Sequence, residues 1–310
     1  MAAEPMSLSG GTGPIRVSVP ANLLLFGEYA VLEEGGLGLA LAPDLRTTAA
    51  FESLGPDHGC TVSGRLPSGT AEWPGSDGML GRVADCLLGA FGPFRGHIEL
   101  DTRALYDAGG RKLGLGSSAA LTVALAALWP VAAGLEPLGD EQLPRVAIET
   151  HRFAQDGRGS GYDIATSALG GCVLFTGGKR PRAERVELPW IPPVGVFSGP
   201  GPVSTAAAVA AYTRWRGRSS VRADRYVDRS NDLVRRFVSA GSWGDARSIV
   251  DEYRELGVWL GEAIGVPAAM QPPGAAETHK AVGAGNELGV IFPAQPGTAI
   301  AIAAEGVRWE

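Results

Sequence analysis

Residues 112–120 bring together the residue types that bind phosphate groups. The segment begins with Lys112 and then holds two glycines and two serines before an apolar stretch, 119–130, that predicts a helix. Gly114 and Gly116 allow the backbone to turn and to approach a ligand closely. Free backbone N–H groups and the positive end of the helix dipole would then face a phosphate. Taken alone, the segment is equally compatible with an ordinary glycine-rich turn into a buried helix.

A second glycine-rich segment, residues 154–162, leads into another predicted helix and places Asp163 at the junction. A carboxylate at that position has two interpretations. It either caps the helix, which is common for an aspartate there, or points into a cleft as a base for proton transfer. The two roles are compatible with each other.

Glu28 lies in a polar break, residues 27–29, between the apolar segments 23–26 and 30–32. If those segments are two parts of a buried strand pair, the break places Glu28 or Tyr29 at the edge of a cleft. The alternative is a glutamate that is simply solvated at a turn.

Two later loops have a similar composition. Residues 199–205 are rich in Gly, Pro, Ser and Thr and open a predicted helix, 206–214. Residues 280–286 contain two glycines and precede a predicted strand, 288–292.

The remaining elements must position these loops, and their predictions rest on apolar periodicity. Further strands are predicted at 15–19, 47–52, 61–62, 71–73, 97–101, 170–176, 194–197 and 299–303, and further helices at 79–91, 142–153, 226–240 and 243–264. The helix after the first loop is expected to end before Pro130 or to be kinked by it.

The composition indicates a globular α/β protein with a substantial core, because 45% of the 310 residues are hydrophobic. The net charge of −6 argues against nucleic acid as the main partner. Three widely spaced cysteines predict neither a zinc site nor a disulfide framework and favour a cytoplasmic setting. No apolar run is long enough to span a membrane, and residues 1–14 are expected to be a flexible tail. The Pro-rich stretch 189–193 predicts two domains, 15–188 and 189–310.

Taken together and in order, residues 20–32, 112–120 and 280–292 resemble the three motifs of the GHMP kinase family. This resemblance implies an α/β (α+β) fold in which a ribosomal-protein-S5-like N-terminal domain precedes a ferredoxin-like C-terminal domain. It also implies ATP and Mg²⁺ as cofactors and a small anionic substrate, which would meet in the cleft between the domains. The sequence leaves the oligomeric state open.

The resemblance also implies roles for individual residues. The catalytic pair would be Asp163, as base or orienting group, and Lys112, as a neutralising charge. ATP would be held by Gly114, Leu115, Gly116, Ser117, Ser118 and Ala119. A magnesium ion would contact Ser118 and Glu28. The substrate would contact Asn22, His151, Arg158, Ser160, Gly161, Ser204, Thr205, Gly283, Ala284 and Gly285.

Within the family, residues 155–165 and 198–205 are most similar to the phosphomevalonate kinase branch, which predicts phosphoryl transfer to phosphomevalonate. A mevalonate kinase or another GHMP kinase is the first alternative. Two departures motivate a second alternative, a catalytically weak binding or regulatory protein. Asn22 stands where the family's first motif usually has lysine, and Asn286 and Glu287 replace part of the last glycine run.

Overall fold

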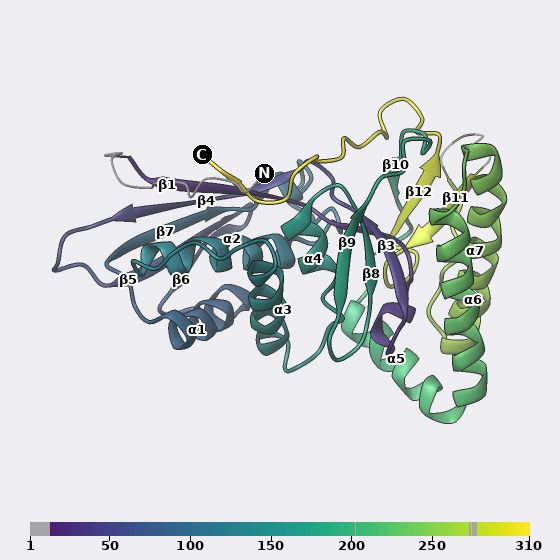
Figure 1. Ribbon diagram of the computed structural model, residues 1–310, viewed down its shortest axis with the longest axis horizontal. Helices are drawn as coiled ribbons and strands as arrows, with labels where there is room; N and C mark the ends of the chain where they lie inside the picture. The colour runs from purple at the N-terminus through teal and green to yellow at the C-terminus, as the bar shows by residue number, and fades with distance from the viewer. Residues whose placement is uncertain (1–12, 202, 273, 275–277) are drawn as a thin grey trace.

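The computed structural model describes residues 13–201, 203–272, 274 and 278–310, and the predicted tail, 1–14, lies almost entirely outside them. The described chain forms three β-sheets with helices packed against them (Figure 1). Among the described residues, no helix has the length and apolar character needed to cross a membrane.

The first sheet has six strands in the order β13-β1-β4-β7-β5-β6. Its strands are β1 (Ile15–Pro20), β4 (Arg46–Ser53), β5 (Cys60–Leu66), β6 (Gly69–Trp73), β7 (Gly96–Asp101) and β13 (Arg308–Trp309). Neighbouring strands are antiparallel, except that β5 and β7 run parallel. Buried and partly exposed residues alternate along β7, as expected for a sheet with one face on the core.

Two helices, α1 (Met79–Phe91) and α2 (Ser117–Ala132), pack on that face, and α3 (Gln142–Ala154) packs against both of them (Figure 1). Helix α2 is buried continuously from Ala119 to Pro130 and is therefore the central element of this core. Its Trp129 packs edge-on against Phe94 and Trp73. The helix runs past Pro130 to Ala132, so the expectation that it ends before the proline is wrong.

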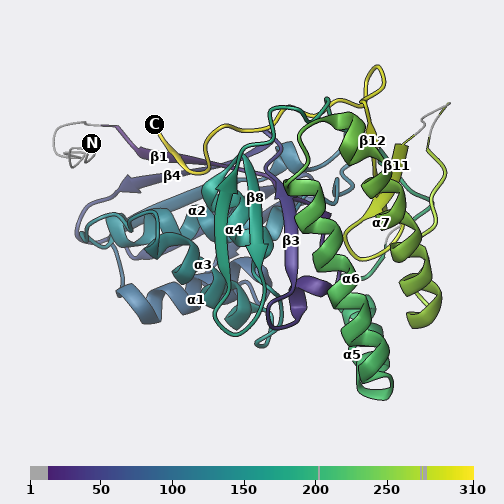
Figure 2. The ribbon, with the colours of Figure 1, turned by 45° about the vertical axis from the view of Figure 1, so that its right-hand side comes forward.

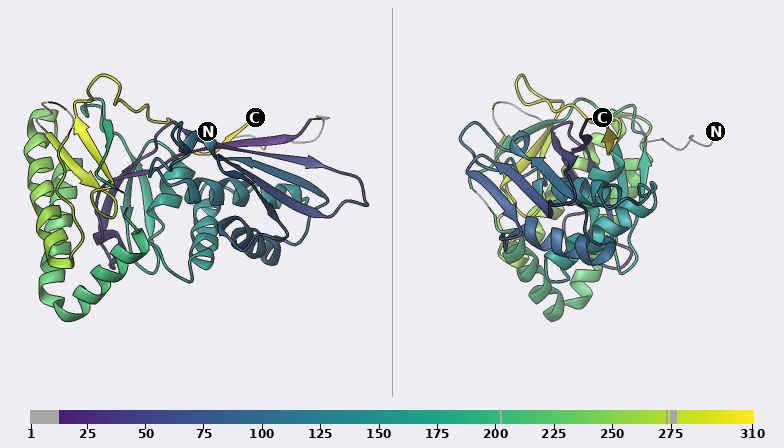
Figure 3. Two further views of the ribbon diagram at one scale, coloured as in Figure 1. Left: turned by 180° about the vertical axis from the view of Figure 1, so that it is seen from behind. Right: turned by 90° about the vertical axis from the view of Figure 1, so that its left-hand side faces the viewer.

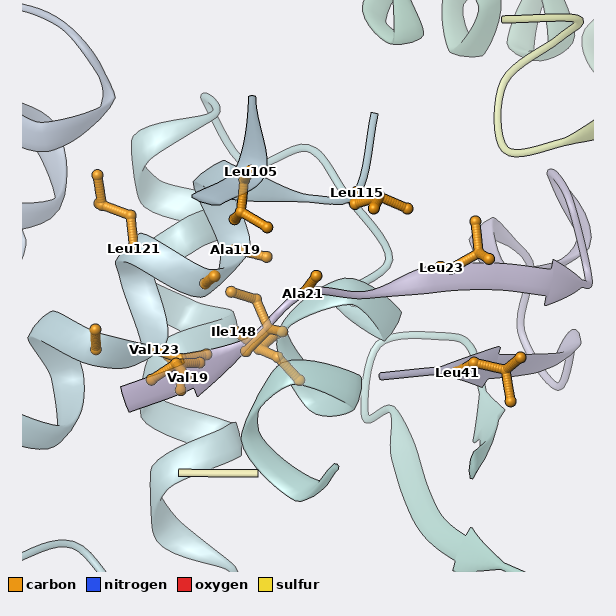
Figure 4. Packing of buried hydrophobic residues seen from close by; sticks show 14 of the residues in the cluster. Val19, Ala21, Leu23, Leu41, Leu105, Leu115, Ala119, Leu121, Val123 and Ile148 are labelled. Carbon is orange, nitrogen blue, oxygen red and sulfur yellow. The ribbon is translucent and has the colours of Figure 1, made fainter. Parts of the chain in front are cut away.

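The second sheet continues directly from the first. After β1 the chain passes through Ala21 into β2 (Leu23–Phe26), which pairs with β3 (Leu37–Leu41), and the sheet is completed by β8 (Cys172–Thr176) and β9 (Arg182–Val186). Along this path Val19 lies near Val123, Ala21 near Ala119 and Leu23 toward Leu115, all within one buried cluster (Figure 4). The start of α2 is thus anchored on the strand that joins the two sheets. The short helix α4 (Tyr162–Leu169) packs against this sheet.

The third sheet has the order β10-β12-β11, formed by β10 (Gly195–Ser198), β12 (Leu288–Phe292) and β11 (Thr278–Val282). Helix α7 (Trp243–Ile264) packs on β11 and helix α6 (Ser220–Val238) packs on β3, while α5 (Thr205–Arg218) packs on these two helices (Figure 2). Seen from behind, α6 and α7 stand at the end of the molecule opposite the far end of the first sheet (Figure 3).

Two strand predictions are wrong. Residues 30–32 continue no strand, because Ala30–Leu32 forms a 3₁₀ helix, η1; a second one, η2, is Arg103–Leu105. Residues 299–303 make only single bridges, from Ala299 to Gly195 and from Ile302 to Pro43. Because these bridges tie the segment to two different places, it crosses between sheets and does not extend one of them. The chain then ends in β13, which pairs with β1 of the first sheet.

The predicted domain boundary at 189 falls between β9 and β10, where the second sheet ends and the third begins. The return of the last strand to the first sheet means that residues 189–310 contribute to both ends of the molecule. The division into two domains stays a prediction.

Candidate active site

All four predicted loops line one cleft with a volume of about 460 Å³. Its walls come from residues 22–32, 112–118, 151–163, 203–209 and 282–288. The second sheet, the start of α2, the start of α4 and the third sheet therefore meet at this place. Segments that are up to about 260 residues apart in the chain contribute to one surface.

The loop before α2 is shaped by two glycines with left-handed backbone conformation, Gly114 and Gly116, each with φ of +75°. Gly116 is the N-cap of α2, and no side chain caps the helix. A Cβ atom at this glycine would lie 2.1 Å from Asn22 Nδ2, so the buried Asn22 side chain would have to move. The loop is therefore built around glycine, and Ser117 and Ser118 line the cleft at the start of the helix with no capping role.

Asn22 holds this loop in place through hydrogen bonds. Its side chain is buried, and Nδ2 donates to Ser167 Oγ at 3.0 Å and to the Gly116 carbonyl at 3.4 Å. Its backbone N–H also donates to the Leu115 carbonyl at 3.0 Å. The residue that replaces the family's lysine thus holds the loop in place and also lines the cleft.

Lys112 is the basic residue at the start of the loop that precedes α2. It is exposed, lines the cleft, and is fixed through a backbone bridge to Tyr106. Among the described residues its ammonium group makes no hydrogen bond or ion pair, so its charge is available to a ligand. Ala119, in contrast, is buried, and its N–H donates to the Gly116 carbonyl; it does not line the cleft.

Asp163 is the second residue of α4 and lines the cleft. The N-cap of that helix is Gly161, with φ of +96°, so the interpretation of Asp163 as the cap is wrong. Its carboxylate is about a quarter exposed, and Oδ2 lies 3.8 Å from Nδ1 of the buried His151. The Gln155 amide in turn lies 2.8 Å from His151 Nε2. The carboxylate is therefore held between the cleft and a fixed imidazole.

Glu28 is not solvated at a turn. Its side chain is 11% exposed, and it forms an ion pair with Lys280, which is 2% exposed. Burial raises the pKa of the Glu28 carboxyl and lowers the pKa of the Lys280 ammonium, and in each case the charge of the partner opposes the shift. Glu28 Oε2 is buried and has no hydrogen-bond partner in the described part of the chain, so one acceptor atom of this carboxylate remains unused there.

Lys280 was missed as a site residue. Its Nζ donates to Glu28 Oε1 at 2.5 Å and to the carbonyls of Leu25 and Ala281 at 2.7 Å each. These three bonds use all three donors of an ammonium group. The rings of Phe26 and Tyr253 flank the charge at 5.4 and 5.2 Å. The sequence pattern predicted Lys280 at the start of a loop, whereas the structure has it in β11, at one of the buried positions of a strand in which buried and half-buried residues alternate.

The turn at residues 27–29 is locked to the third sheet and its helices. Tyr253 of α7 accepts from the Gly27 N–H at 2.7 Å, and Tyr226 of α6 donates to the Glu28 carbonyl. Across the cleft, the Tyr29 hydroxyl donates to the Ala284 carbonyl at 3.0 Å. The first and the last loop of the site are thus joined by direct hydrogen bonds.

The other predicted contacts divide into two groups. Four of them line the cleft: Ser160, Thr205, Gly283 and Ala284. The rest face elsewhere. Arg158 pairs with Asp156 at 3.0 Å, and Ser204 caps α5 by accepting from the Ala207 N–H at 3.3 Å.

Two glycines also lie outside the cleft. Gly161 packs against Ile148, and Gly285 lines a smaller pocket behind Glu28. The functional roles of all these residues stay predictions.

Glu287, which the sequence marks as a departure from the last glycine run, has a structural role in the cleft. It lines the cleft, its Oε2 accepts from the Val203 N–H at 3.2 Å, and its carbonyl accepts from the Gly199 N–H at 2.7 Å. It therefore ties the loop before α5 to the last glycine loop. Among the described residues, no three His, Cys, Asp or Glu side chains gather in a way that could hold a metal ion by themselves.

The sequence of this chain is similar to those of known kinases. Residues 79–171 match the GHMP kinases N terminal domain. The chain is 30% identical over 281 residues to the phosphomevalonate kinase of Streptomyces sp. strain CL190, covering 76% of this chain and 75% of the relative. It is 29% identical over 208 residues to the mevalonate kinase of Pyrococcus furiosus, covering 62% and 60%.

Two solved structures show the same fold. A Lin0012 protein from Listeria innocua superposes with a TM-score of 0.79 at 20% identity, covering 96% of this chain and 99% of that one. Streptococcus pneumoniae phosphomevalonate kinase, in complex with phosphomevalonate and AMPPNP, superposes with a TM-score of 0.69 at 16% identity, covering 89% and 91%. The expected mixed α/β fold is confirmed.

Proposed function

Because this chain belongs to the GHMP kinase family, we propose that it transfers the γ-phosphoryl group of ATP to a small-molecule acceptor in the cleft described above. The observation that carries the proposal is the convergence of two features on one cleft. One is the glycine loop at the start of the buried helix α2, and the other is the Asp163 carboxylate at the start of α4.

Phosphoryl transfer depends on positioning and on charge neutralisation more than on covalent chemistry by the protein. The backbone of residues 114–118 would hold the phosphates at the positive end of the α2 dipole. Lys112 would neutralise charge on the transferred group, since its ammonium is exposed to the cleft. Asp163 would accept the proton of a hydroxyl acceptor, or orient it, with His151 behind it.

Magnesium would arrive with ATP, and it prefers hard oxygen ligands and retains several waters. The cleft offers two such groups that fit, the Ser118 hydroxyl and the unused Oε2 of Glu28. When bound, the ion would neutralise phosphate charge. The Lys280 ammonium already occupies the other oxygen of Glu28, so at most one oxygen of this carboxylate serves the ion.

Two acceptors are candidates, and each is supported by similarity. Phosphomevalonate is the acceptor that the name of the Streptomyces relative implies, and the bound ligand named for the Streptococcus pneumoniae structure agrees. Mevalonate is the acceptor implied by the name of the Pyrococcus furiosus relative. Either would make this protein an enzyme of the mevalonate pathway.

The test is ADP release by the purified chain from Mg·ATP against mevalonate, phosphomevalonate, homoserine and galactose. Acceptor-dependent turnover, on the order of 1–10³ per second, supports the proposal. Binding of ATP without turnover on any acceptor would instead indicate a binding or regulatory protein, which is the role that Asn22 and Glu287 suggested from the sequence.

A further inference from the structure

We infer that the acceptor is an alcohol that carries no phosphate group, and that its hydroxyl receives the phosphoryl group. This inference rests on the kinase function proposed above and decides between its candidate acceptors. It follows from the charges that face the cleft and from the position of Asp163.

The cleft is poor in cations. Among the described residues that line it, the only lysine or arginine is Lys112, whereas three carboxylates line it, those of Glu28, Asp163 and Glu287. The residues outside the described part contain no lysine or arginine, so they cannot add one of these side chains to the cleft. Lys112 is therefore the only basic side chain of this lining that can serve the triphosphate of ATP, beside the backbone of 114–118 and the magnesium ion that would arrive with the nucleotide.

Three other cations that bond to the cleft residues or belong to its loops have partners in the protein. Lys280 is fully bonded to Glu28 and two carbonyls. Arg152 donates to the carbonyls of Gly159 at 3.0 Å and Ser160 at 2.7 Å, and so supports the loop from outside the cleft. Arg158 pairs with Asp156. None of these three lines the cleft, so none is placed to neutralise a phosphate on the acceptor.

A phosphorylated acceptor would carry most of its second negative charge at neutral pH, since the second pKa of a phosphate ester is near 6. Lys280 balances the charge of Glu28, whereas among the described residues no lysine or arginine pairs with Asp163 or Glu287, and the side chain beside Asp163 is the imidazole of His151. Glu287 is anchored to the Val203 N–H, beside the loop that opens α5. A phosphate placed between these carboxylates would be repelled by both.

An alcohol suits the same surroundings, because a hydroxyl donates a hydrogen bond and carboxylates accept one. The reaction also balances with the residues present. The hydroxyl oxygen forms a bond to the γ-phosphorus, and the bond from that phosphorus to the β–γ bridging oxygen breaks, which leaves ADP. The hydroxyl proton passes to the Asp163 carboxylate and then to solvent. A phosphate acceptor is already ionised and would need no such base.

The direct test compares each alcohol with its own phosphate ester, using the full chain and Mg·ATP: mevalonate with phosphomevalonate, homoserine with phosphohomoserine, and galactose with galactose 1-phosphate. We expect kcat/KM to be about 100-fold or more higher for one of the alcohols than for its ester, because like charges in a cleft are strongly disfavoured. A phosphate ester that is turned over better than every alcohol would overturn the inference.

Calorimetry separates this inference from the proposed function. Mg·AMPPNP is titrated first; if it does not bind, the kinase proposal fails before the acceptor is in question. Phosphomevalonate is then titrated into the complex with Mg·AMPPNP. No binding at millimolar concentration supports the inference, and micromolar affinity overturns it even where turnover is absent.

A charge variant gives a second readout. Glu287→Gln keeps the length of the side chain and an oxygen that can accept from the Val203 N–H. We expect it to raise kcat/KM for phosphomevalonate about fivefold or more through the loss of one repelling charge. The matched control is Glu136→Gln, an exposed carboxylate outside the cleft, which should change nothing. An equal response in both variants would contradict the role of cleft charge.

Discussion

Lys280 Nζ lies 2.5 Å from Glu28 Oε1, and this ion pair joins strand β11 of the third sheet to the turn that follows β2 of the second. Both side chains are nearly removed from solvent, and the ammonium has no donor left for a ligand. Lys280 therefore acts on the cleft through Glu28 and the turn that carries it. The pair therefore holds the turn at residues 27–29, which lines the cleft, against the third sheet.

The first prediction concerns this pair. Lys280→Met should lower the free energy of unfolding by about 3–5 kcal/mol, because it leaves a buried carboxylate without its counter-charge. Urea denaturation measures the change. The control is Arg65→Met, which removes the exposed pair with Glu99 and should cost less than about 1 kcal/mol.

The double variant Glu28→Gln/Lys280→Met sharpens that test. Since it removes both charges, it should be more stable than Lys280→Met alone, and the two single effects should not add. Additive losses would show that the two residues contribute separately and would contradict the ion-pair account.

The second prediction concerns the glycine at the start of α2. Gly116→Ala should weaken Mg·ATP binding about tenfold or more, because the added methyl group meets the Asn22 amide and the backbone is in a left-handed conformation. Equilibrium titration with AMPPNP measures this affinity. Gly89→Ala on the exposed face of α1, where nothing lies within 4 Å, should leave nucleotide binding intact and stabilise the helix by roughly 0.5–1 kcal/mol.

The third prediction concerns Asp163. Asp163→Asn should reduce kcat by about 10²–10⁴-fold for an alcohol acceptor, because the amide cannot accept the hydroxyl proton. The affinity for AMPPNP should stay unchanged. Asp156→Asn, an exposed aspartate on the same loop, should keep near-wild-type kcat. The kcat of each purified variant is measured at steady state. Equal kcat values for the two variants would show that Asp163 has no specific role in the reaction.

The fourth prediction concerns Lys112. Lys112→Ala should lower kcat/KM for ATP by about 10–100-fold, since the charge-assisted hydrogen bonds that an ammonium makes to phosphate would be lost. The melting temperature should not change, because the side chain is exposed and holds no partner among the described residues. Lys179→Ala, an exposed lysine outside the cleft, is the control. A parallel loss of kcat/KM in both variants would argue against a local role.

The sequence predicted the elements whose signal is local. The helices at 79–91 and 243–264 and the strand at 288–292 begin and end where the periodicity indicated. The spacing of apolar residues that predicts these elements can be read within the element itself, without knowledge of its partners in the fold. The segment at 299–303 carried the same apolar pattern, but its bridges to Gly195 and Pro43 are set by distant partners, and no local pattern indicates them.

The site followed the same division. The loops were recognisable because glycine, serine and a following helix are adjacent in sequence. The state of Glu28 was not, because its partner Lys280 is 252 residues away and a single lysine in a strand does not reveal what it pairs with. The bracing role of Asn22 likewise depends on Ser167, 145 residues later.

Phosphoryl transfer in this cleft produces ADP and a phosphate ester, and following both products in one reaction tests it. The purified full chain is incubated with Mg·ATP and each alcohol of the acceptor series, and ADP formation is followed together with the phosphorus NMR spectrum of the product. If the cleft transfers the phosphoryl group to an alcohol, ADP should form only in the presence of one of the alcohols, and the phosphate ester of that alcohol should appear with it. Both products should be lost in Asp163→Asn. ADP formation at the acceptor-free rate with every compound, alcohols and esters alike, by a protein that binds Mg·AMPPNP would contradict this transfer.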